Sequence, residues 1–402
     1  MNNLFNTIML TLSFVCCIMP LNIFILGGIL MKKIIRVLTV RKHKTVTFID
    51  AYQEFCKKIQ LMVSNDLLET ISLNVGDLMM IDSNETLNRK GNPINEITKI
   101  HWNIVPIVWE SYKGVSSTLQ SPVENLRLNA RNGGKQINLF LARNSFIDSI
   151  KTYLTNMGYI EIHCKSIEEK RTSAKRNPLA VASIHQSEPL YLRITMENQL
   201  KQAVSILLHS VFSLDNVYYD KGTSPNAEKE VLILELVSVD QTIEDLIKFI
   251  FELDSLLRNT FYTFNLSNYG YTLPDSLSII DCNGKSPDNI SQFQNSILLN
   301  VPVNSPFIRA DATGKRVEFQ WIIRGKMVGH GYDDEFNYNN LLDAVNHQMH
   351  VLNLEDCNKM EYTRYGLPKT TSLGLGIDIV LKYFFNIEYL VNISNPLGFD
   401  YK

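Results

Sequence analysis

Tyr365-Gly366-Leu367-Pro368 and, shortly after it, Ser372-Leu373-Gly374-Leu375-Gly376-Ile377-Asp378-Ile379 form the most informative stretch of this chain. In its second part, glycines alternate with apolar residues and lead into a helix-like segment, residues 380–385. Glycine has no Cβ atom, so alternating glycines let a strand and a helix start pack closely around a ligand. The stretch predicts a strand that runs into a helix beside a ligand site.

Two strand-like segments precede this stretch. One contains Asn216-Val217-Tyr218 and the other Val231-Leu232-Ile233-Leu234-Glu235-Leu236, and their composition favours antiparallel strands. The loop between them, residues 219–229, contains no arginine. Farther upstream, Leu190-Tyr191-Leu192-Arg193-Ile194 predicts a strand that enters a helix at Met196-Glu197-Asn198-Gln199-Leu200-Lys201.

Together these segments resemble the motifs of class II aminoacyl-tRNA synthetases, in the form carried by lysyl-tRNA synthetases. The stretch 372–379 is similar to motif 3, the pair of strands to motif 2, and residues 143–162 to motif 1. The resemblance covers nearly the whole chain after Lys32. It implies an α+β fold, in which an N-terminal OB-fold β-barrel precedes an antiparallel sheet domain flanked by helices. It also implies a homodimer built through the motif 1-like segment.

The chain departs from the family at the residues that handle ATP. An arginine that holds the phosphates in the family is Ile379 here, and the motif 2 loop 219–229 lacks the family's arginine. Met327 replaces an acidic Mg²⁺ ligand, and a thioether is a poor ligand for Mg²⁺. Lys165 replaces the proline that closes the motif 1 strand. Adenylate formation needs clustered positive charge on the phosphates, so these losses predict activity near background.

Several residues remain as candidates for a ligand pocket. Carboxylates at a half-buried site favour a cationic ligand, because buried charges need a partner of opposite sign. The alternative for Glu235 is an internal salt bridge. Asp334 is also the one candidate for holding a metal, and ATP and Mg²⁺ are expected as cofactors only if the chain is an active enzyme. The pocket candidates are Glu197, Glu235, Tyr332, Asp334, Glu335, Gly374 and Gly376.

Residues 32–109 contain short β-rich runs separated by turn residues, as expected for a small barrel. Their order resembles the anticodon-binding OB-fold of the same family, and OB-folds hold single strands with basic grooves and stacking aromatic rings. Two interpretations are open: an RNA-binding surface, or a solvated basic face with Phe48 in the core. The candidates for RNA contacts are Arg36, Arg41, Lys44 and Phe48.

The remaining segments set the domain plan. Residues 1–31 form a hydrophobic N-terminal segment in which Ile8 to Leu30 carry no charge, long enough for one membrane span. A membrane anchor, an additional buried segment and a true start at Met31 are all open. Residues 110–136 read as a linker from their glycine, serine and proline content. Residues 137–402 form the synthetase-like domain.

The amino-acid composition limits the possible functions but does not identify one. The 402 residues carry a formal net charge of -2, so the whole chain gives no nucleic-acid signal. The six cysteines include no CxxC pair, which argues against a zinc site or a disulfide framework. We expect a cytoplasmic protein, anchored to a membrane if residues 8–30 span one. The expected partner is tRNA or another RNA.

Two functions from different classes are consistent with these residues. The first is a lysyl-tRNA synthetase-like protein that does not catalyse, and binds tRNA, a related ligand or a partner protein. The second is an enzyme that still activates lysine with ATP and charges tRNA through rearranged contacts. The missing arginines favour the first.

Overall fold

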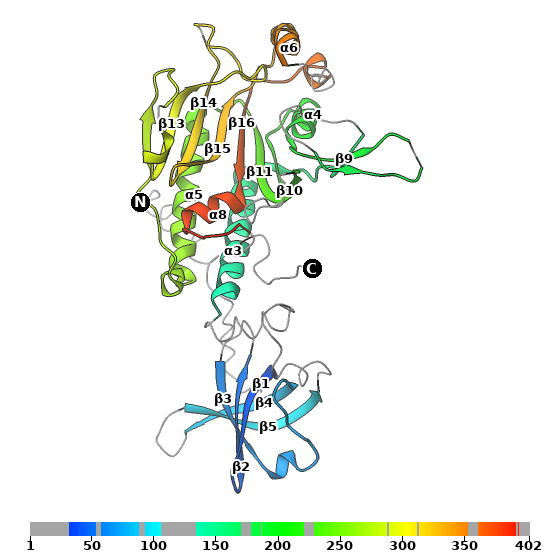
Figure 1. Ribbon diagram of the computed structural model, residues 1–402, viewed down its shortest axis with the longest axis vertical. Helices are drawn as coiled ribbons and strands as arrows, with labels where there is room; N and C mark the ends of the chain where they lie inside the picture. The colour runs from blue at the N-terminus through cyan, green and yellow to red at the C-terminus, as the bar shows by residue number, and fades with distance from the viewer. Residues whose placement is uncertain are drawn as a thin grey trace, which may run out of the picture. The chain divides into compact units, whose positions relative to one another are not determined.

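The computed structural model of the chain forms two compact units, Met1–Thr118 and Leu119–Lys402. Figure 1 shows the helices and strands of each. The structure describes residues 32–53, 58–87, 93–105, 134–169, 178–185, 187–220, 229–287, 289–311, 313–352, 361–390 and 393. The hydrophobic segment 1–31 and most of the predicted linker 110–136 lie outside these residues. Within the described part, no helix is long and apolar enough to cross a membrane.

The first unit contains a closed barrel of five strands in the order β1-β2-β3-β5-β4. Buried and outward-facing residues alternate along its strands. In β2, Thr47, Ile49 and Ala51 are buried, while Phe48 and Asp50 face outward. Successive side chains of a strand point to opposite faces, so every second residue enters the core. The predicted N-terminal β-barrel is confirmed. Its strands are β1 (Lys33–Lys42), β2 (Val46–Tyr52), β3 (Lys58–Ser64), β4 (Leu78–Leu87) and β5 (Pro93–Ile104).

The second unit is built on an eight-stranded sheet with the order β12-β13-β14-β15-β16-β11-β10-β6. Neighbours pair antiparallel except at the two edges, where β6 pairs with β10 and β12 with β13 in parallel. The predicted antiparallel pair is formed by β10 and β11, and β16 lies on the other side of β11. The strands are β6 (Ile160–Glu161), β10 (Val211–Tyr218), β11 (Glu230–Val239), β12 (Ser278–Asp281), β13 (Asn295–Pro302), β14 (Val317–Ile323), β15 (Lys326–Asp333) and β16 (Thr370–Gly376).

The two faces of this sheet have different roles. Leu232, Leu234 and Leu236 of β11 enter the main hydrophobic core together with residues of α3, α5 and α8. The residues between them, Ile233 and Glu235, therefore face the opposite side. Figure 1 shows α3 and α5 running along the sheet. The helices are α3 (Lys135–Asn156), α4 (Glu197–Leu207), α5 (Ile243–Thr263), α6 (Tyr338–Leu352), α7 (Glu361–Arg364) and α8 (Ile377–Phe384).

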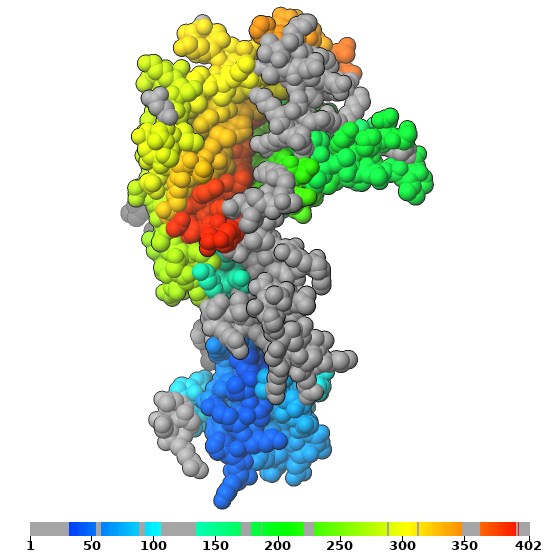
Figure 2. Space-filling view, in the orientation of Figure 1, coloured from blue at the N-terminus to red at the C-terminus, as the bar shows by residue number. Residues whose placement is uncertain are grey.

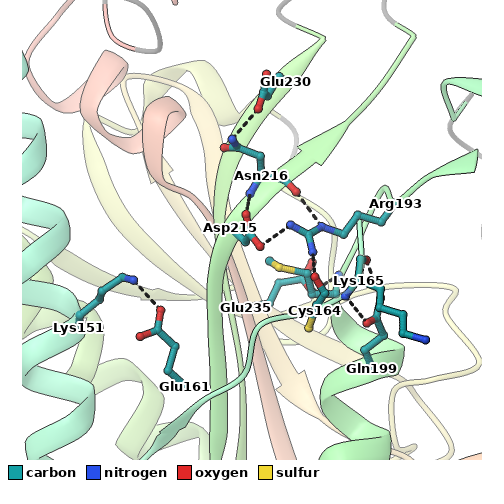
Figure 3. Close-up of polar contacts among 11 residues, drawn as sticks. Lys151, Glu161, Cys164, Lys165, Arg193, Gln199, Asp215, Asn216, Glu230 and Glu235 are labelled. Atoms are coloured by element: carbon teal, nitrogen blue, oxygen red, sulfur yellow. Dashed lines mark hydrogen bonds and ion pairs between the residues drawn. The ribbon is translucent and has the colours of Figure 1, made fainter. Parts of the chain in front are cut away.

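A small three-stranded sheet, in the order β7-β9-β8, stands out from the body of the second unit in Figures 1 and 2. Arg193, at its base, is fully buried and joins three segments, as Figure 3 shows. Its guanidinium donates to the carbonyls of Cys164 and Asn216 and pairs with Asp215 at 2.6 Å. The strands are β7 (Ile167–Glu168), β8 (Ala180–Val181) and β9 (Leu190–Leu192).

The backbone of Lys165, where the resemblance implies a proline, is held by the side chain of Gln199. Its backbone N–H donates to Oε1 of Gln199 at 2.7 Å, and its carbonyl accepts from Nε2 of Gln199 at 3.1 Å (Figure 3). A proline has no N–H and could not make the first bond. The amide of Gln199 thus fixes the backbone that a proline would otherwise restrict.

We predict that Gln199→Ala lowers the free energy of unfolding by about 1 kcal/mol, because two backbone groups at a partly exposed site lose a partner. Chemical denaturation measures the change. Gln202→Ala is the matched control, since Gln202 is exposed on the same helix, α4. Equal stabilities of the two variants would contradict a bracing role for Gln199.

Candidate ligand-binding site

A cavity of about 460 Å³ opens on the face of the sheet that looks away from α3 and α5. Its floor is formed by β11, β16 and β15, which are neighbours in the sheet. The volume lies within the range of about 300–1,000 Å³ that is usual for small-molecule sites. Its polar lining residues include Thr195, Glu197, Glu235, Glu318, His330, Tyr332 and Ser372.

Gly374 opens the floor of this cavity between two titratable side chains. In the ladder, Gly374 pairs with Glu235 on one side and with His330 on the other. A Cβ atom built on Gly374 would lie 3.8 Å from Nε2 of His330, so the imidazole leans over the glycine. The absence of a side chain here leaves room between Glu235 and His330 for a ligand.

A buried lysine organises the wall beside this floor. Nζ of Lys201 lies 2.5 Å from Oε1 of Glu197 and 2.7 Å from Oδ1 of Asp334. Burial lowers the pKa of Lys201, but the two carboxylates outweigh it and raise that pKa well above its usual value. Tyr332 donates to Glu197 at 2.9 Å, and Ser372 donates to Asp334 at 2.7 Å. We call these five residues the Lys201 cluster.

The acids that the sequence predicted for the pocket have different positions and partners. Glu197 lines the cavity, whereas Asp334 is fully buried with its two oxygens engaged by Lys201 and Ser372. Burial raises the pKa of Asp334, and Lys201 opposes that shift. Glu335 is also buried, and it accepts from the backbone N–H of Asn337 just before α6. Among the described residues, no three acidic, histidine or cysteine side chains group as metal ligands would.

Glu235 differs from Glu197 and Asp334 because its hydrogen-bond partners are uncharged. Oε1 accepts from the hydroxyl of Thr195 at 2.8 Å, and Oε2 accepts from the backbone N–H of Met196 at 2.7 Å. The described residues supply no ion pair to it, so the internal salt bridge considered from sequence is not present there. Burial and the nearby charge of Glu197 raise its pKa to about 7.

A second pair, His330 and Glu318, lines the cavity and was not expected from the sequence. Nδ1 of His330 lies 3.0 Å from Oε2 of Glu318, and Gln320 donates to Oε1 of the same glutamate at 2.8 Å. Burial lowers the pKa of His330, but Glu318 outweighs it and raises that pKa. The only sequence signal was alternation along two adjacent strands, β14 and β15, which does not reveal the pairing.

The other end of the cavity is apolar. Ile379 lies over Gly376, with its Cδ1 only 3.0 Å from a Cβ atom built there. Val231, Ile233 and Met327 line the same cavity. Among the described lining residues there is no arginine and no lysine. Of the motif 2-like loop, residues 221–228 lie outside the described part of the chain.

In the barrel, the structure places the four RNA candidates in different settings. Phe48 faces outward and meets His43 edge to face at 5.4 Å, so the interpretation as a core residue is wrong. Arg41 pairs with Asp50 at 2.9 Å on the surface. Arg36 is half-buried and donates to the carbonyl of Gly76, and Lys44 is exposed.

Comparison with known proteins gives distant but consistent relatives. No family model matches the chain. Lysine–tRNA ligase of Buchnera aphidicola (Schizaphis graminum) is 22% identical over 310 residues, which cover 62% of this chain and 61% of that protein. Lysine–tRNA ligase of Dehalococcoides mccartyi is 22% identical over 258 residues, covering 61% and 49%. The chain therefore spans about half to three fifths of the length of these relatives.

A relative of a different kind is the lysylphosphatidylglycerol biosynthesis bifunctional protein LysX of Mycobacterium leprae. It is 21% identical over 214 residues, which cover 50% of this chain and 18% of that protein.

The raised pKa of Glu235 predicts a pH-dependent stability. Because the folded protein holds this proton more tightly than the unfolded chain, the contribution is complete below about pH 4.5 and is lost as pH rises through about 7. Glu235→Gln cannot ionise at this position, so its free energy of unfolding should fall less than that of wild type between pH 5 and pH 8. The shift of the pKa from 4.5 to about 7 corresponds to a difference on the order of 3 kcal/mol.

Denaturant unfolding at a series of pH values measures this difference. The exposed Glu244→Gln is the control and should keep the slope of the wild type. Parallel stability curves for wild type and Glu235→Gln would show that the carboxyl group is not perturbed.

Proposed function

Because the chain is related to the lysyl-tRNA synthetases, we propose that it keeps their frame but has lost ATP-dependent amino-acid activation. In this proposal, the second unit has the class II synthetase fold and its cavity binds a cationic amine. The order of the sheet supports the fold, since the motif 2-like strands β10 and β11 and the motif 3-like strand β16 lie side by side. The first unit then contacts tRNA or another RNA.

The contrast between the two ends of the cavity carries this proposal. Glu197 and Glu235 remain at one end, where a cation is favoured. At the other end, where a triphosphate and Mg²⁺ would need positive charge and oxygen ligands, the described lining is Ile379, Ile233 and Met327. These residues do not fit ATP and Mg²⁺, so we derive no catalytic step through either.

A homodimer is part of the same proposal, with α3 and β6 at its interface. Met157, Ile160 and Leu208 expose 57%, 41% and 67% of their surface. The backbone N–H of Ile160 donates to the carbonyl of Ser210, two residues after Leu208, so these apolar side chains belong to one region. Exposed apolar groups that cluster in this way favour a protein interface.

We predict no lysine-dependent exchange of pyrophosphate into ATP by the purified protein. Removal of one contact to developing charge typically lowers a rate by ~10²–10³, and this cavity lacks several. Ile379→Arg should not restore exchange, because one guanidinium leaves the Met327 position without an acid. Exchange clearly above background in wild type, dependent on lysine, would establish the active enzyme instead.

The barrel should bind tRNA weakly and in a salt-dependent way. Contacts to phosphate release counterions, so the logarithm of affinity should fall with the logarithm of salt by about 0.7 per contact on single strands. Phe48→Ala should weaken binding by ~1–3 kcal/mol if a base stacks on the ring. The melting temperature of the Phe48→Ala variant should stay close to that of wild type, because Phe48 faces outward.

Filter binding over a salt series, with thermal melts of the same variants, separates stacking from stability. The double variant Arg41→Gln, Lys44→Gln should make the dependence of the logarithm of affinity on the logarithm of salt less steep, by the amount that roughly one to two phosphate contacts contribute. Exposed Lys99→Gln on β5 is a control for loss of charge alone. Undetectable RNA binding at low salt would remove this part of the proposal.

A further inference from the structure

We infer that the amine bound in this cavity carries a neutral oxygen close to its ammonium group, and that Nε2 of His330 donates a hydrogen bond to that oxygen. The inference rests on the proposed amine site and adds to it the chemical class of the ligand, a short amine with an ether or hydroxyl oxygen. Three features of the cavity carry it: the orientation of the imidazole, the open position at Gly374, and the charges that surround His330.

The imidazole of His330 has one nitrogen engaged and the other directed at the floor of the cavity. Nδ1 lies 3.0 Å from Oε2 of Glu318, whose other oxygen accepts from Gln320 at 2.8 Å. Nε2 lies 3.8 Å from a Cβ atom built on Gly374. Among the described residues, none forms a hydrogen bond or an ion pair with Nε2, and the side chain is 42% exposed. Nε2 is therefore the nitrogen that a ligand can reach.

Gly374 keeps an interval open between His330 and Glu235. It pairs with Glu235 of β11 on one side and with His330 of β15 on the other. Adjacent strands lie ~4.8 Å apart, so the backbones of β11 and β15 are separated by roughly 10 Å. The imidazole takes up part of this interval, because its Nε2 and Cδ2 are the nearest atoms to a Cβ atom built on the glycine. A ligand in the remainder meets both residues with groups only one or two carbon atoms apart.

The charges around His330 favour its protonated form. Burial lowers the pKa of His330, but Glu318 raises it through the hydrogen bond and its charge, and Glu197 and Glu235 add to this effect. Tyr332, whose ring centre lies 5.7 Å from that of the imidazole, stays neutral because burial raises its pKa well above the usual value. Both nitrogens of a protonated imidazole are donors. Nε2 therefore selects an acceptor in the ligand.

The acceptor is a neutral oxygen and not a carboxylate. The imidazolium of His330 is already paired with Glu318, and the described lining of the cavity contains no arginine and no lysine. A ligand carboxylate would add negative charge next to Glu318 and Glu235 without a further cation to pair with it. An ether or hydroxyl oxygen accepts the hydrogen bond without this cost. The ligand class therefore differs from an amino acid.

Calorimetry with 2-methoxyethylamine and butylamine tests the inference, because the two amines differ only by an oxygen in place of one methylene group. The full-length protein should bind the ether at least about fivefold more tightly, since a hydrogen bond from a charged donor outweighs the burial of one methylene group. Glycine, which places a carboxylate beside its ammonium group, should bind more weakly than the ether.

The pH dependence of the affinity ratio identifies the donor. Titration of Glu235 affects both ammonium groups alike, so it cancels in the ratio. The preference for the ether should be largest below the usual histidine pKa of 6.5 and should fall as pH rises through the raised pKa of His330. A neutral imidazole that donates from Nδ1 to Glu318 has a lone pair at Nε2, which repels an ether oxygen.

Variants locate the effect at His330. His330→Phe keeps an aromatic ring without the donor and should remove the preference for the ether. Glu318→Gln removes the charge that raises the pKa of His330, so the fall of the preference should move to lower pH; it repeats the test if His330→Phe does not fold. His185→Phe, at an exposed histidine outside the cavity, is the matched control and should keep the wild-type ratio at every pH.

The outcomes separate the inference from the proposal on which it rests. If neither 2-methoxyethylamine nor butylamine binds the wild type, the proposed amine site itself fails. If both bind equally, or if butylamine binds more tightly, the amine site stands and the contact with oxygen is refuted. A preference that is constant with pH, or that survives His330→Phe, refutes donation by Nε2. Tighter binding of glycine than of the ether refutes the neutral acceptor.

Discussion

The ion pairs of Lys201 hold together the part of the structure on which the site depends. The ammonium is almost completely buried, and it meets Asp334 at the end of β15 and Glu197 at the start of α4. Through the hydroxyl of Ser372, Asp334 is also joined to β16. A buried ion pair contributes little net stability, but removal of one partner costs about 3–5 kcal/mol. The cluster therefore fixes where α4 lies against the sheet, and with it one wall of the cavity.

This dependence explains why the acids of the site differ in what they indicate about a ligand. Asp334 and Glu197 have a structural role, since both form ion pairs with Lys201. Glu235 has none of this kind: its partners are a hydroxyl and a backbone N–H, and its ionised form is disfavoured by burial. A carboxylate that raises the free energy of the folded protein at neutral pH is expected where function requires it. Glu235 is thus the acid on which the proposed cationic site rests.

The sequence predicted what alternation and glycine spacing control. The barrel, the strand pair β10–β11 and the passage from β16 into α8 all follow from local patterns. It did not predict pairings that depend on register, such as His330 with Glu318, or a side-chain contact between distant segments, such as that of Gln199 with the backbone of Lys165. The outward position of Phe48 was open because period-two alternation has two phases, and only the neighbouring strands select one.

The two ends of the cavity are coupled by their electrostatics. Ile233 and Ile379 exclude polar groups from one end of the cavity. Less water near the floor lowers the local dielectric, which strengthens an attraction between Glu235 and a cation as much as it penalises the unpaired carboxylate.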